Sequence, residues 1–389
     1  MKFEMKTKAL RFLSDIQTGP FGSQLHKEDY VDDGTPIVTV EHLGNRVFTE
    51  QNLPRVSNED KQRLSKYILK EGDVVFSRVG SVDRCSFVDS QHTGWLFSGR
   101  CLRVRPFEEI SPLFLYYFFC LESTKKFIRN IAVGATMPSI NTKLMGEIEV
   151  SYPDKQVQEK IANLLGAIDD KIELNNAIND NLADLLQTIY QERFGNDILA
   201  VNQGVLSDIC SYSRDKVAVS ELNVRTYFST ENMLSGKAGS TEATSLPTTS
   251  QTTACHKGDT LISNIRPYFK KIVYCEDKCG CSTDVLCFTP SQPCYSAYLF
   301  STLYADKFFA FMVAGSKGTK MPRGDKQQIM TYPVVLPSEE ELAGFNTIAS
   351  PLLEQIYSNR AENKRLSILR DTLLPKLMSG EIDVSAVQL

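Results

Sequence analysis

The alternation of hydrophobic and polar positions divides the chain into two halves of the same design. Each half begins with short β-type runs that are separated by Gly, Asp and Ser positions and followed by one long apolar stretch. In the first half, the pattern predicts strands over 36–40, 73–79 and 100–104 and a buried helix over 113–131. In the second half, it predicts strands over 260–265, 271–275 and 285–289 and an aromatic-rich helix over 295–313.

A different pattern follows each mixed segment, with seam positions in alternating steps of four and three that predict a long helix of the coiled-coil type. The first seam runs through Ile161, Leu165, Ile168, Ile172, Asn175, Asn179, Leu182, Leu186 and Ile189. A shift of 184 gives the second seam, Phe345, Ala349, Leu352, Ile356, Asn359, Asn363, Leu366, Arg370 and Leu373. Asparagines recur at the same two seam positions, where a buried amide restricts register and orientation. The alternative is that these asparagines face solvent at the ends of two shorter helices.

The same period relates other parts of the chain, so the repeat comprises a whole domain and a helix. Residues 134–138 (GATMP) correspond to 318–322 (GTKMP), and 148–153 correspond to 332–337. Residues 71–77 resemble 257–263 at an offset of 186. The predicted fold class is α+β, a pseudo-twofold repeat of two mixed domains separated by two long helices that form an antiparallel coiled-coil spacer. Each helix has about 35 to 40 residues and a length of roughly 50 to 60 Å.

This arrangement resembles the specificity subunit of a type I restriction-modification system, and four stretches carry the likeness. Residues 19–25 (GPFGSQL), with Tyr30, Gly34 and Pro36 after them, are similar to the start of a target recognition domain in that family. The others are 72–81 (GDVVFSRVGS), the spacer entry 153–162 (PDKQVQEKIA) and the C-terminal string 373–382 (LLPKLMSGEI). The second half departs from the family pattern, because it lacks a GPFGS equivalent near 211–219 and has a weaker spacer entry at 337–341.

The resemblance implies a DNA-binding module without catalytic activity of its own. It assigns 1–153 and 196–337 to two target recognition domains, and 154–195 and 338–389 to two spacer helices, the second with a C-terminal tail. Each domain would read one half of a split, asymmetric DNA sequence, and the spacer would set the gap. Two methyltransferase subunits and restriction subunits are the implied partners, and they would use S-adenosylmethionine, ATP and Mg²⁺.

The spacer helices also carry apolar residues outside the seam, more than a two-helix contact needs. They are Leu164, Leu174, Ile178 and Leu185 in the first helix and Leu353, Ile368, Leu369 and Leu377 in the second. The resemblance makes them docking positions for methyltransferase subunits, whereas packing against the recognition domains is the plain alternative. A coiled-coil adaptor with two protein-binding end domains is the competing function.

The sequence lacks motifs for chemistry of its own. It contains no GxxxxGK[ST] or GxGxxG phosphate loop and no Asn- or Asp-Pro-Pro-aromatic string of amino-methyltransferases, which disfavours a self-contained methyltransferase. The four histidines show no metal-binding spacing, and the CxxxCxC run of Cys275, Cys279 and Cys281 is more often coincidence than a zinc site. We therefore expect no metal and no cofactor bound by this chain.

Charge first argues against DNA, because 43 basic and 47 acidic residues give the 389-residue chain a net charge of −4. Divided by segment, the two spacer regions carry −7 and the two recognition domains +3. The acidity thus belongs to the spacer. Without an apolar run of membrane-spanning length or a secretion signal, the expected location is the cytoplasm, where the ten cysteines remain thiols.

Candidate DNA contacts are the basic and amide residues beside two repeated features, the central strand and the glycine-containing loop. Arg grips guanine, Asn reads adenine, and Lys or Thr holds phosphate, although any one of them can equally be an ordinary surface residue. The candidates are Arg78, Arg84, Thr136, Asn141, Lys143, Arg266, Lys270, Lys271, Lys317, Lys320 and Arg323. Arg78 and Arg266 are expected on equivalent strands.

Overall fold

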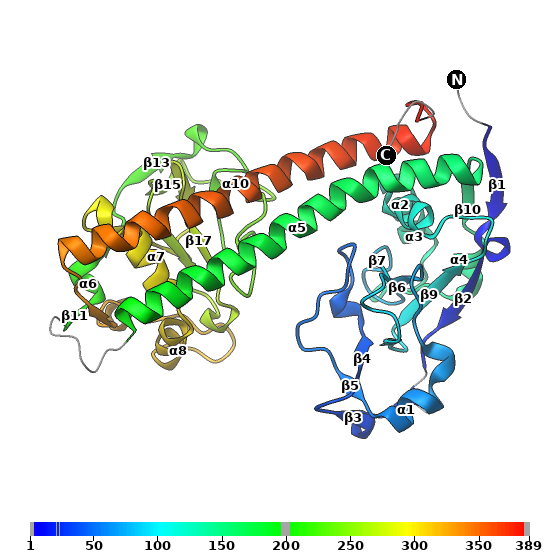
Figure 1. The fold of residues 1–389 in the computed structure, drawn as a ribbon, viewed down its shortest axis with the longest axis horizontal. Coiled ribbons are helices and arrows are strands. Elements are labelled where there is room, and N and C mark those ends of the chain that lie inside the picture. The colour runs from blue at the N-terminus through cyan, green and yellow to red at the C-terminus, as the bar shows by residue number, and fades with distance from the viewer. Residues whose placement is uncertain (1–3, 21, 23, 196–202, 385–389) are drawn as a thin grey trace. The chain divides into compact units, whose positions relative to one another are not determined.

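A computed structural model describes residues 4–20, 22, 24–195 and 203–384 (Figure 1). The chain divides into two compact units. Unit 1 comprises Met1–Glu173 and Asn363–Leu389, and unit 2 comprises Leu174–Glu362. Each unit therefore contains one mixed α+β domain and part of both long helices. No helix in the described ranges is long and apolar enough to cross a membrane. Phe21 and Ser23 of the opening GPFGSQL stretch lie outside the described residues.

The domain of unit 1 is built on two four-stranded sheets, ordered β2-β9-β6-β7 and β3-β5-β4-β8, with a separate antiparallel pair β1-β10. The strands are β1 Lys6–Ala9, β2 Ser14–Thr18, β3 Tyr30–Val31, β4 Thr35–Val38, β5 Arg55–Val56, β6 Val74–Ser77, β7 Cys85–Phe87, β8 Leu96–Phe97, β9 Cys101–Pro106 and β10 Glu149–Tyr152. The helices are α1 Asn58–Arg63, α2 Pro112–Cys120, α3 Glu122–Ile131 and α4 Thr142–Gly146. Strand β6 is buried along its whole length.

The domain of unit 2 repeats this plan, with sheets ordered β12-β19-β16-β17 and β13-β15-β18-β14 and a pair β11-β20. The strands are β11 Gln203–Val205, β12 Cys210–Tyr212, β13 Lys216–Ala218, β14 Tyr227–Phe228, β15 Gln251–Cys255, β16 Thr260–Ser263, β17 Ile272–Tyr274, β18 Cys279–Cys281, β19 Val285–Pro290 and β20 Pro333–Val335. The helices are α6 Leu206–Ile209, α7 Ser296–Tyr304, α8 Asp306–Ala314 and α9 Lys326–Ile329. The predicted strands of both halves thus exist, and their ends differ from the predicted ends by at most two residues.

The prediction of a single apolar helix in each half is wrong, because each half has two helices in its place. Leu121 separates α2 from α3 and Ala305 separates α7 from α8, with nearly the same extended backbone (φ −57°, ψ 132° and φ −62°, ψ 140°). The first helix of each pair is buried on most sides, whereas α3 buries only Thr124 and Ile128. A break lets the second helix leave the core, which a continuous apolar helix could not do.

The spacer prediction is confirmed as two helices of 40 residues, α5 Lys155–Phe194 and α10 Glu339–Met378. Within unit 1, Arg370 donates to Oδ1 of Asp169 at 2.6 Å, and Asn363 donates to the carbonyl of Ile172 at 3.4 Å. Numbers fall along α10 as they rise along α5, so the segments run antiparallel. In unit 2, Asn175 and Asn179 pair with Glu362 and Asn359 in the same sense, at 2.7 and 2.9 Å.

The seam asparagines therefore lie in the helix interface, and the alternative that they face solvent at the ends of shorter helices does not hold. Asn175, Asn179 and Asn359 are buried, and Asn363 is half-buried. The arginine in the seam also has a polar partner there, because Arg370 neutralises the buried carboxylate of Asp169. This carboxylate also accepts a hydrogen bond of 2.7 Å from the Tyr117 hydroxyl. Polar seam positions are thus paired with polar partners rather than left in an apolar contact.

Each unit packs its share of the helix pair onto its own domain. In unit 1, Ile161 and Leu165 of α5 and Leu377 of α10 belong to the same buried cluster as Phe114 and Phe119 of α2. In unit 2, Tyr190 and Phe194 of α5 and Phe345 of α10 surround Tyr298 of α7, with ring centroids 4.9 to 6.4 Å apart. The helices are thus part of each domain's core and support the strands described next.

Candidate nucleic-acid interface

The central strand of each domain ends in the same turn. In unit 1, the Ser77 hydroxyl donates to the carbonyl of Val79 at 2.8 Å, and in unit 2 the Ser263 hydroxyl donates to the carbonyl of Ile265 at 3.2 Å. The next residue takes the left-handed backbone conformation, with φ of 76° at Gly80 and 50° at Arg266. Glycine adopts this conformation freely, whereas an arginine is strained in it and must be held by its surroundings.

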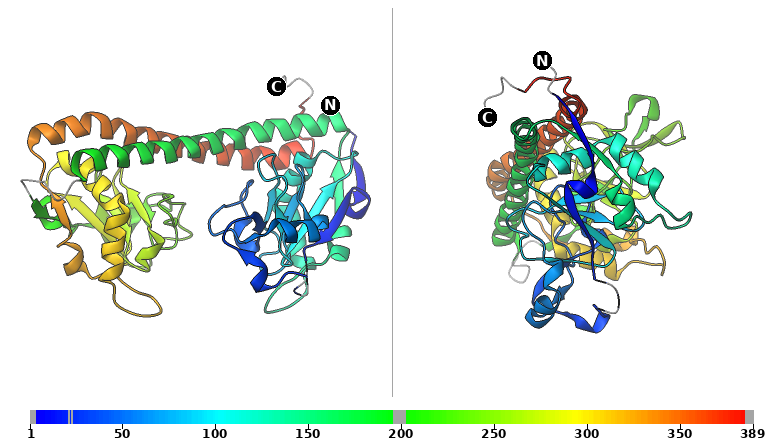
Figure 2. Two further views of the ribbon diagram at one scale, coloured as in Figure 1. Left: turned by 60° about the horizontal axis from the view of Figure 1, so that its bottom comes forward. Right: turned by 90° about the vertical axis from the view of Figure 1, so that its right-hand side faces the viewer.

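A closed loop, here called the glycine loop, packs against each turn. Its ends are joined by two backbone hydrogen bonds, at 2.9 and 2.8 Å between Val133 and Ser139 and at 2.9 Å each between Lys317 and Arg323. Gly134 and Gly318 have φ of 112° and 102°, and a Cβ on Gly134 would lie 2.7 Å from the Met137 carbonyl oxygen. Glycine is therefore required at the first loop position. Figure 2 shows each loop extending from the body of its own unit.

Identical backbone bonds attach the glycine loops to the turns. The amides of Gly80 and Arg266 donate to the carbonyls of Pro138 and Pro322, each at 2.8 Å. The carbonyl of Arg78 accepts from Ile140 at 3.0 Å, and that of Asn264 accepts from Gly324 at 3.3 Å. Arg78 and Arg266 therefore follow equivalent strands, β6 and β16, although neither lies within its strand. Their positions in the turn differ, because the offset between the copies is 186 here, so Arg78 corresponds to Asn264 and Arg266 to Gly80.

Three of the five unit 1 candidates gather at this scaffold. Arg78 leaves the end of β6 and donates to the carbonyl of Gly99 at 3.2 Å, Thr136 is exposed on the glycine loop, and Lys143 is exposed on α4 just beyond it. The other two have structural roles. Arg84 turns its guanidinium to the Leu43 carbonyl, where it packs against Gly44, and Asn141 caps α4 by accepting from the Leu144 amide at 2.9 Å.

In unit 2, four candidates lie together at the equivalent place. Lys317 pairs with Asp325 at 2.6 Å, Arg323 pairs with Asp284 at 3.0 Å while remaining more than half exposed, and Lys320 is exposed on the glycine loop. Arg266 supplies the turn, and its buried Nε has no hydrogen-bond partner among the described residues. The unit 2 loop is therefore the more basic of the two.

Lys270 and Lys271 are directed elsewhere. Lys270 pairs with Asp306 at the start of α8, at 2.9 Å, and Lys271 donates to the Thr230 carbonyl at 2.6 Å. Burial lowers the pKa of Lys271. Both lysines therefore stabilise the fold around the turn. They are weaker candidates for DNA contact than Lys317, Lys320 and Arg323.

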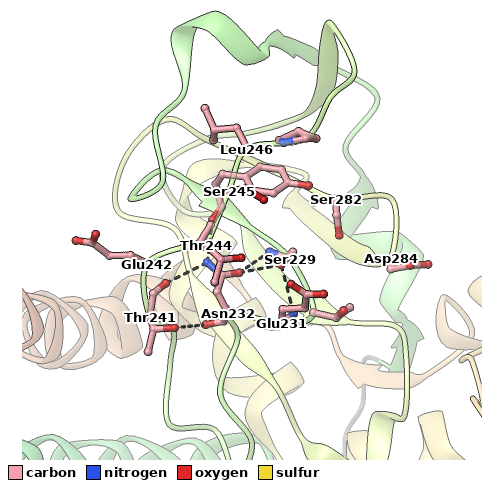
Figure 3. A pocket seen from close by; sticks show the side chains of 14 residues that line it. Ser229, Glu231, Asn232, Thr241, Glu242, Thr244, Ser245, Leu246, Ser282 and Asp284 are labelled. Atoms are coloured by element: carbon pink, nitrogen blue, oxygen red, sulfur yellow. Dashed lines mark hydrogen bonds between the residues drawn. The ribbon is translucent and has the colours of Figure 1, made fainter. Parts of the chain in front are cut away.

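A polar pocket of about 310 Å³ opens beside the unit 2 loop (Figure 3). Asn232 organises its floor by accepting from the Ser229 amide at 2.6 Å and donating to the carbonyls of Tyr227 and Thr241 at 2.9 and 3.0 Å. Carboxylates and hydroxyls dominate the rest of the lining, including Asp284, the partner of Arg323. Such a lining offers acceptors to amino groups and repels phosphate.

The cysteines of unit 2 form a buried cluster. Cys255, Cys275, Cys279, Cys281 and Cys287 all lie in one core, and the Sγ atoms of Cys275 and Cys279 are 3.5 Å apart. Hydrogen bonds from Cys255 and Cys275 lower the pKa of Cys279 to about 5. No three His, Cys, Asp or Glu side chains in the part of the chain that the structure describes are arranged to hold a metal ion. The absence of a bound metal stays a prediction.

Comparisons with known proteins relate the chain to one family. Residues 4–183 match the family described as the type I restriction modification DNA specificity domain. A type I restriction enzyme specificity subunit of Methanocaldococcus jannaschii, MjaIX, is 23% identical over 97% of this chain and 93% of its own length. The chain is thus similar to type I specificity subunits over almost its whole length. The HindI specificity subunit of Haemophilus influenzae is 28% identical, but the match spans only 42% of this chain and 37% of that protein.

A solved structure supports this fold. The type I restriction-modification S subunit from M. genitalium superposes with a TM-score of 0.56 and covers 96% of both chains at 18% identity. The likeness extends over both repeats, although the family match itself ends inside α5. The two-copy architecture inferred from the sequence is therefore shared with a known relative.

Sequence reasoning missed several residues of this surface. Asn264 occupies the position of Arg78, and Asp284 positions Arg323 beside the pocket. Neither follows a motif, and only the correct offset of 186 reveals Asn264. Met137 and Met321 were visible as part of the repeated GxxMP motif, and the structure places both on the glycine loops with exposed side chains.

Proposed function

We propose that this chain is the DNA-specificity subunit of a type I restriction-modification complex, in which each recognition domain reads one half of a bipartite, asymmetric target. One observation carries the proposal. The turn and glycine loop are built by the same backbone hydrogen bonds in both units but carry different side chains, Thr136 against Lys320 and, at the end of the loop, Ser139 against Arg323. A shared scaffold with different reading groups suits two related domains that recognise different bases.

The helix pair supports a spacer role in this function. Seam pairs such as Asn179 with Asn359 and Asp169 with Arg370 can form in only one register, because a shifted helix would leave buried polar groups without partners. A fixed register gives the spacer a fixed length. The gap between the half-sites would follow from that length.

Exposed apolar residues on the helices support docking of methyltransferase subunits. Of the positions predicted outside the seam, Leu174, Ile178, Leu185, Ile368 and Leu369 are exposed, whereas Leu353 and Leu377 are buried and Leu164 packs on the core of unit 1. The alternative of packing onto the recognition domains therefore explains only part of the set. A protein that contacts helices through leucine and isoleucine would cover the remainder.

We infer that catalysis belongs to partner subunits. Methyltransferase subunits, in two copies, would use S-adenosylmethionine, and restriction subunits would use ATP and Mg²⁺, while this chain binds none of these cofactors and works in the cytoplasm. The net positive charge of the recognition domains is small, which favours weak DNA binding by the isolated chain and tight, salt-sensitive binding in the complex.

Mapping modified adenines in the host genome tests the function directly. We expect a split motif in two halves that disappears when the gene for this chain is deleted and returns when it is restored. A variant with Arg78→Ala should relax the motif in one half only, and Arg323→Ala, which removes an exposed arginine of the unit 2 loop, should relax it in the other. A genome whose modified motifs are unchanged by the deletion would contradict the proposal.

Binding assays separate this function from the coiled-coil adaptor. The complex with methyltransferase subunits should shift a duplex that contains the mapped motif and not a scrambled duplex. An adaptor would form the protein complex without a sequence-specific shift. Replacing Leu174 and Ile178 by Ser should prevent co-purification with the methyltransferase, whereas the matched variant Phe107→Ser, an exposed aromatic of unit 1, should not.

A further inference from the structure

Two methionines occupy the same exposed position in the two repeats. Met137 is 62% exposed and Met321 is 50% exposed, each followed by a proline on its glycine loop. The two residues before each methionine differ between the loops. They are Ala135 and Thr136 in the first loop and Thr319 and Lys320 in the second. A single exposed apolar side chain is common on protein surfaces. The same exposed apolar side chain at the same loop position of both repeats requires an explanation.

The fold of the loop gives no such cause. Neither methionine belongs to a buried core cluster, and the bonds that close both loops and attach them to the turns involve other residues. Glycine at the loop start, the two bonds across its ends and the Pro138 or Pro322 bond to the turn hold the methionine outward. A rigid backbone that presents an apolar side chain loses little conformational entropy when that side chain is inserted into a partner.

The surroundings indicate what the partner is. Lys317, Lys320 and Arg323 share the loop with Met321, and Arg78 and Lys143 lie beside the loop that carries Met137. A protein surface that combines phosphate-binding cations with a projecting apolar side chain fits a nucleic-acid duplex, in which phosphates flank an apolar stack of bases. Methionine is flexible and polarisable, so it packs well against base faces.

We propose that Met137 and Met321 are wedges, each of which enters one base step of its own half-site and partly unstacks it. This inference rests on the proposed DNA-specificity function. Unstacking a base step costs free energy, and this cost is lowest at flexible pyrimidine-purine steps. Each wedge would therefore contribute to sequence preference at a step where no hydrogen bond to a base edge is made.

Fluorescence of 2-aminopurine tests the wedges in the complex with methyltransferase subunits, on a duplex that carries the mapped target. The probe is placed at successive positions of both half-sites, and its emission rises where a base loses its stacking partner. The wild-type complex should raise emission at one step in each half-site. Met137→Ala should abolish the rise in one half-site and leave the other unchanged, and Met321→Ala should do the opposite.

Matched variants separate an apolar wedge from a loop that merely needs its side chain. Met137→Leu, which remains apolar, should keep the signal, whereas Met137→Gln, which keeps the length but is polar, should lose most of it. The Tm of all these variants should equal that of the wild type, because the methionine side chain is exposed. An unchanged Tm shows that loss of the fluorescence signal does not come from unfolding.

The outcomes distinguish the wedge from the function on which it rests. If the wild-type complex binds its target specifically but no probe brightens, or if the Ala variants keep the full signal, the wedges are refuted and the specificity function stands. If the wild-type complex shows no specific binding, both proposals fall. If Met137→Ala instead prevents assembly with the methyltransferase, the loop is a protein contact and the wedge is refuted.

Discussion

Asn359 donates through Nδ2 to Oδ1 of Asn179 at 2.9 Å, and both side chains are buried in the helix pair of unit 2. Gln355 in turn donates to Oδ1 of Asn359 at 2.7 Å. The amides thus satisfy one another in a chain across and along the helices. A one-turn slip of α10 would place Asn179 against the apolar residue Ile356 and leave its amide unpaired.

This pair predicts an asymmetry between single and double substitutions. Asn359→Leu should lower the free energy of unfolding by about 1 to 3 kcal/mol, because it leaves the buried Asn179 amide without its partner. Replacing both asparagines by Leu should recover most of that loss, since no buried polar group remains. Chemical denaturation of the four proteins of this cycle gives the coupling energy. A double variant as unstable as the sum of the two singles would contradict the pairing.

The same double variant should expose the role of the pair in register. Without this polar pair, a shift of the helix pair costs less free energy, so we expect a stable protein whose complex methylates targets with more than one gap length. Sequencing of modified DNA from cells that carry the variant measures this. A single, unchanged gap would show that other contacts, such as the Arg370 to Asp169 pair of unit 1, fix the register on their own.

Arg46 anchors the spacer helix to the domain within unit 1 and gives a second stability prediction. Its guanidinium donates to both carboxylate oxygens of Glu173, at 2.8 and 2.7 Å, and also reaches Asp170 and the Gly166 carbonyl. Arg46→Ala should cost about 1 to 2 kcal/mol, and Arg46→Lys should recover only part, because an ammonium cannot make the bidentate contact. Replacing the exposed Arg63 by Ala is the control, and it should lower the free energy of unfolding by clearly less than Arg46→Ala when both are measured by urea titration.

The repeat shows what could be predicted from the sequence and why. Period-2 and seam patterns reflect burial, so strands β6 and β16 and both 40-residue helices follow from the order of apolar residues. The breaks at Leu121 and Ala305 do not, because neither Pro nor Gly marks them and the residues on both sides favour a helix. Only the tertiary packing of α3 and α8 decides that the chain turns there.

The sequence predicted where the candidate residues lie, but not which contacts each of them makes. Basic residues beside the repeated motifs correctly indicated the turn and the glycine loop. What each side chain does depends on partners far away in the sequence, such as Leu43 for Arg84 and Thr230 for Lys271. Arg78 and Arg266 follow equivalent strands but differ in position, because Arg78 comes directly after β6 whereas Arg266 lies further along the turn after β16.

A pH dependence follows from Asp306 at the start of α8. Hydrogen bonds from Lys237 and Lys270, at 2.7 and 2.9 Å, lower the pKa of this carboxyl below its ordinary value. A lowered folded-state pKa contributes stability that is complete above the unfolded-state pKa and is lost as pH falls through the folded-state value. Asp306→Asn should therefore reduce Tm at pH 7, and the difference from wild type should disappear as pH falls below the unfolded-state pKa and through the lower folded-state pKa. The exposed Asp277, replaced by Asn, is the control, and a constant Tm difference across this range would contradict the assignment.

The salt dependence of DNA binding distinguishes lysines that neutralise phosphate from lysines that stabilise the fold. Lys320 is exposed on the glycine loop, whereas Lys278 in the same unit pairs with Glu221 at 2.8 Å near β18. If Lys320 contacts a phosphate, Lys320→Ala should weaken binding of the methyltransferase complex to its target and reduce the slope of log K against log salt by about 1. The loss should be similar for target and scrambled duplexes, because a phosphate contact carries no sequence information.

Lys278→Ala is the control and should change neither the affinity nor the slope. Titrations over several salt concentrations measure both slopes, and equal slopes for wild type and Lys320→Ala would remove Lys320 from the interface.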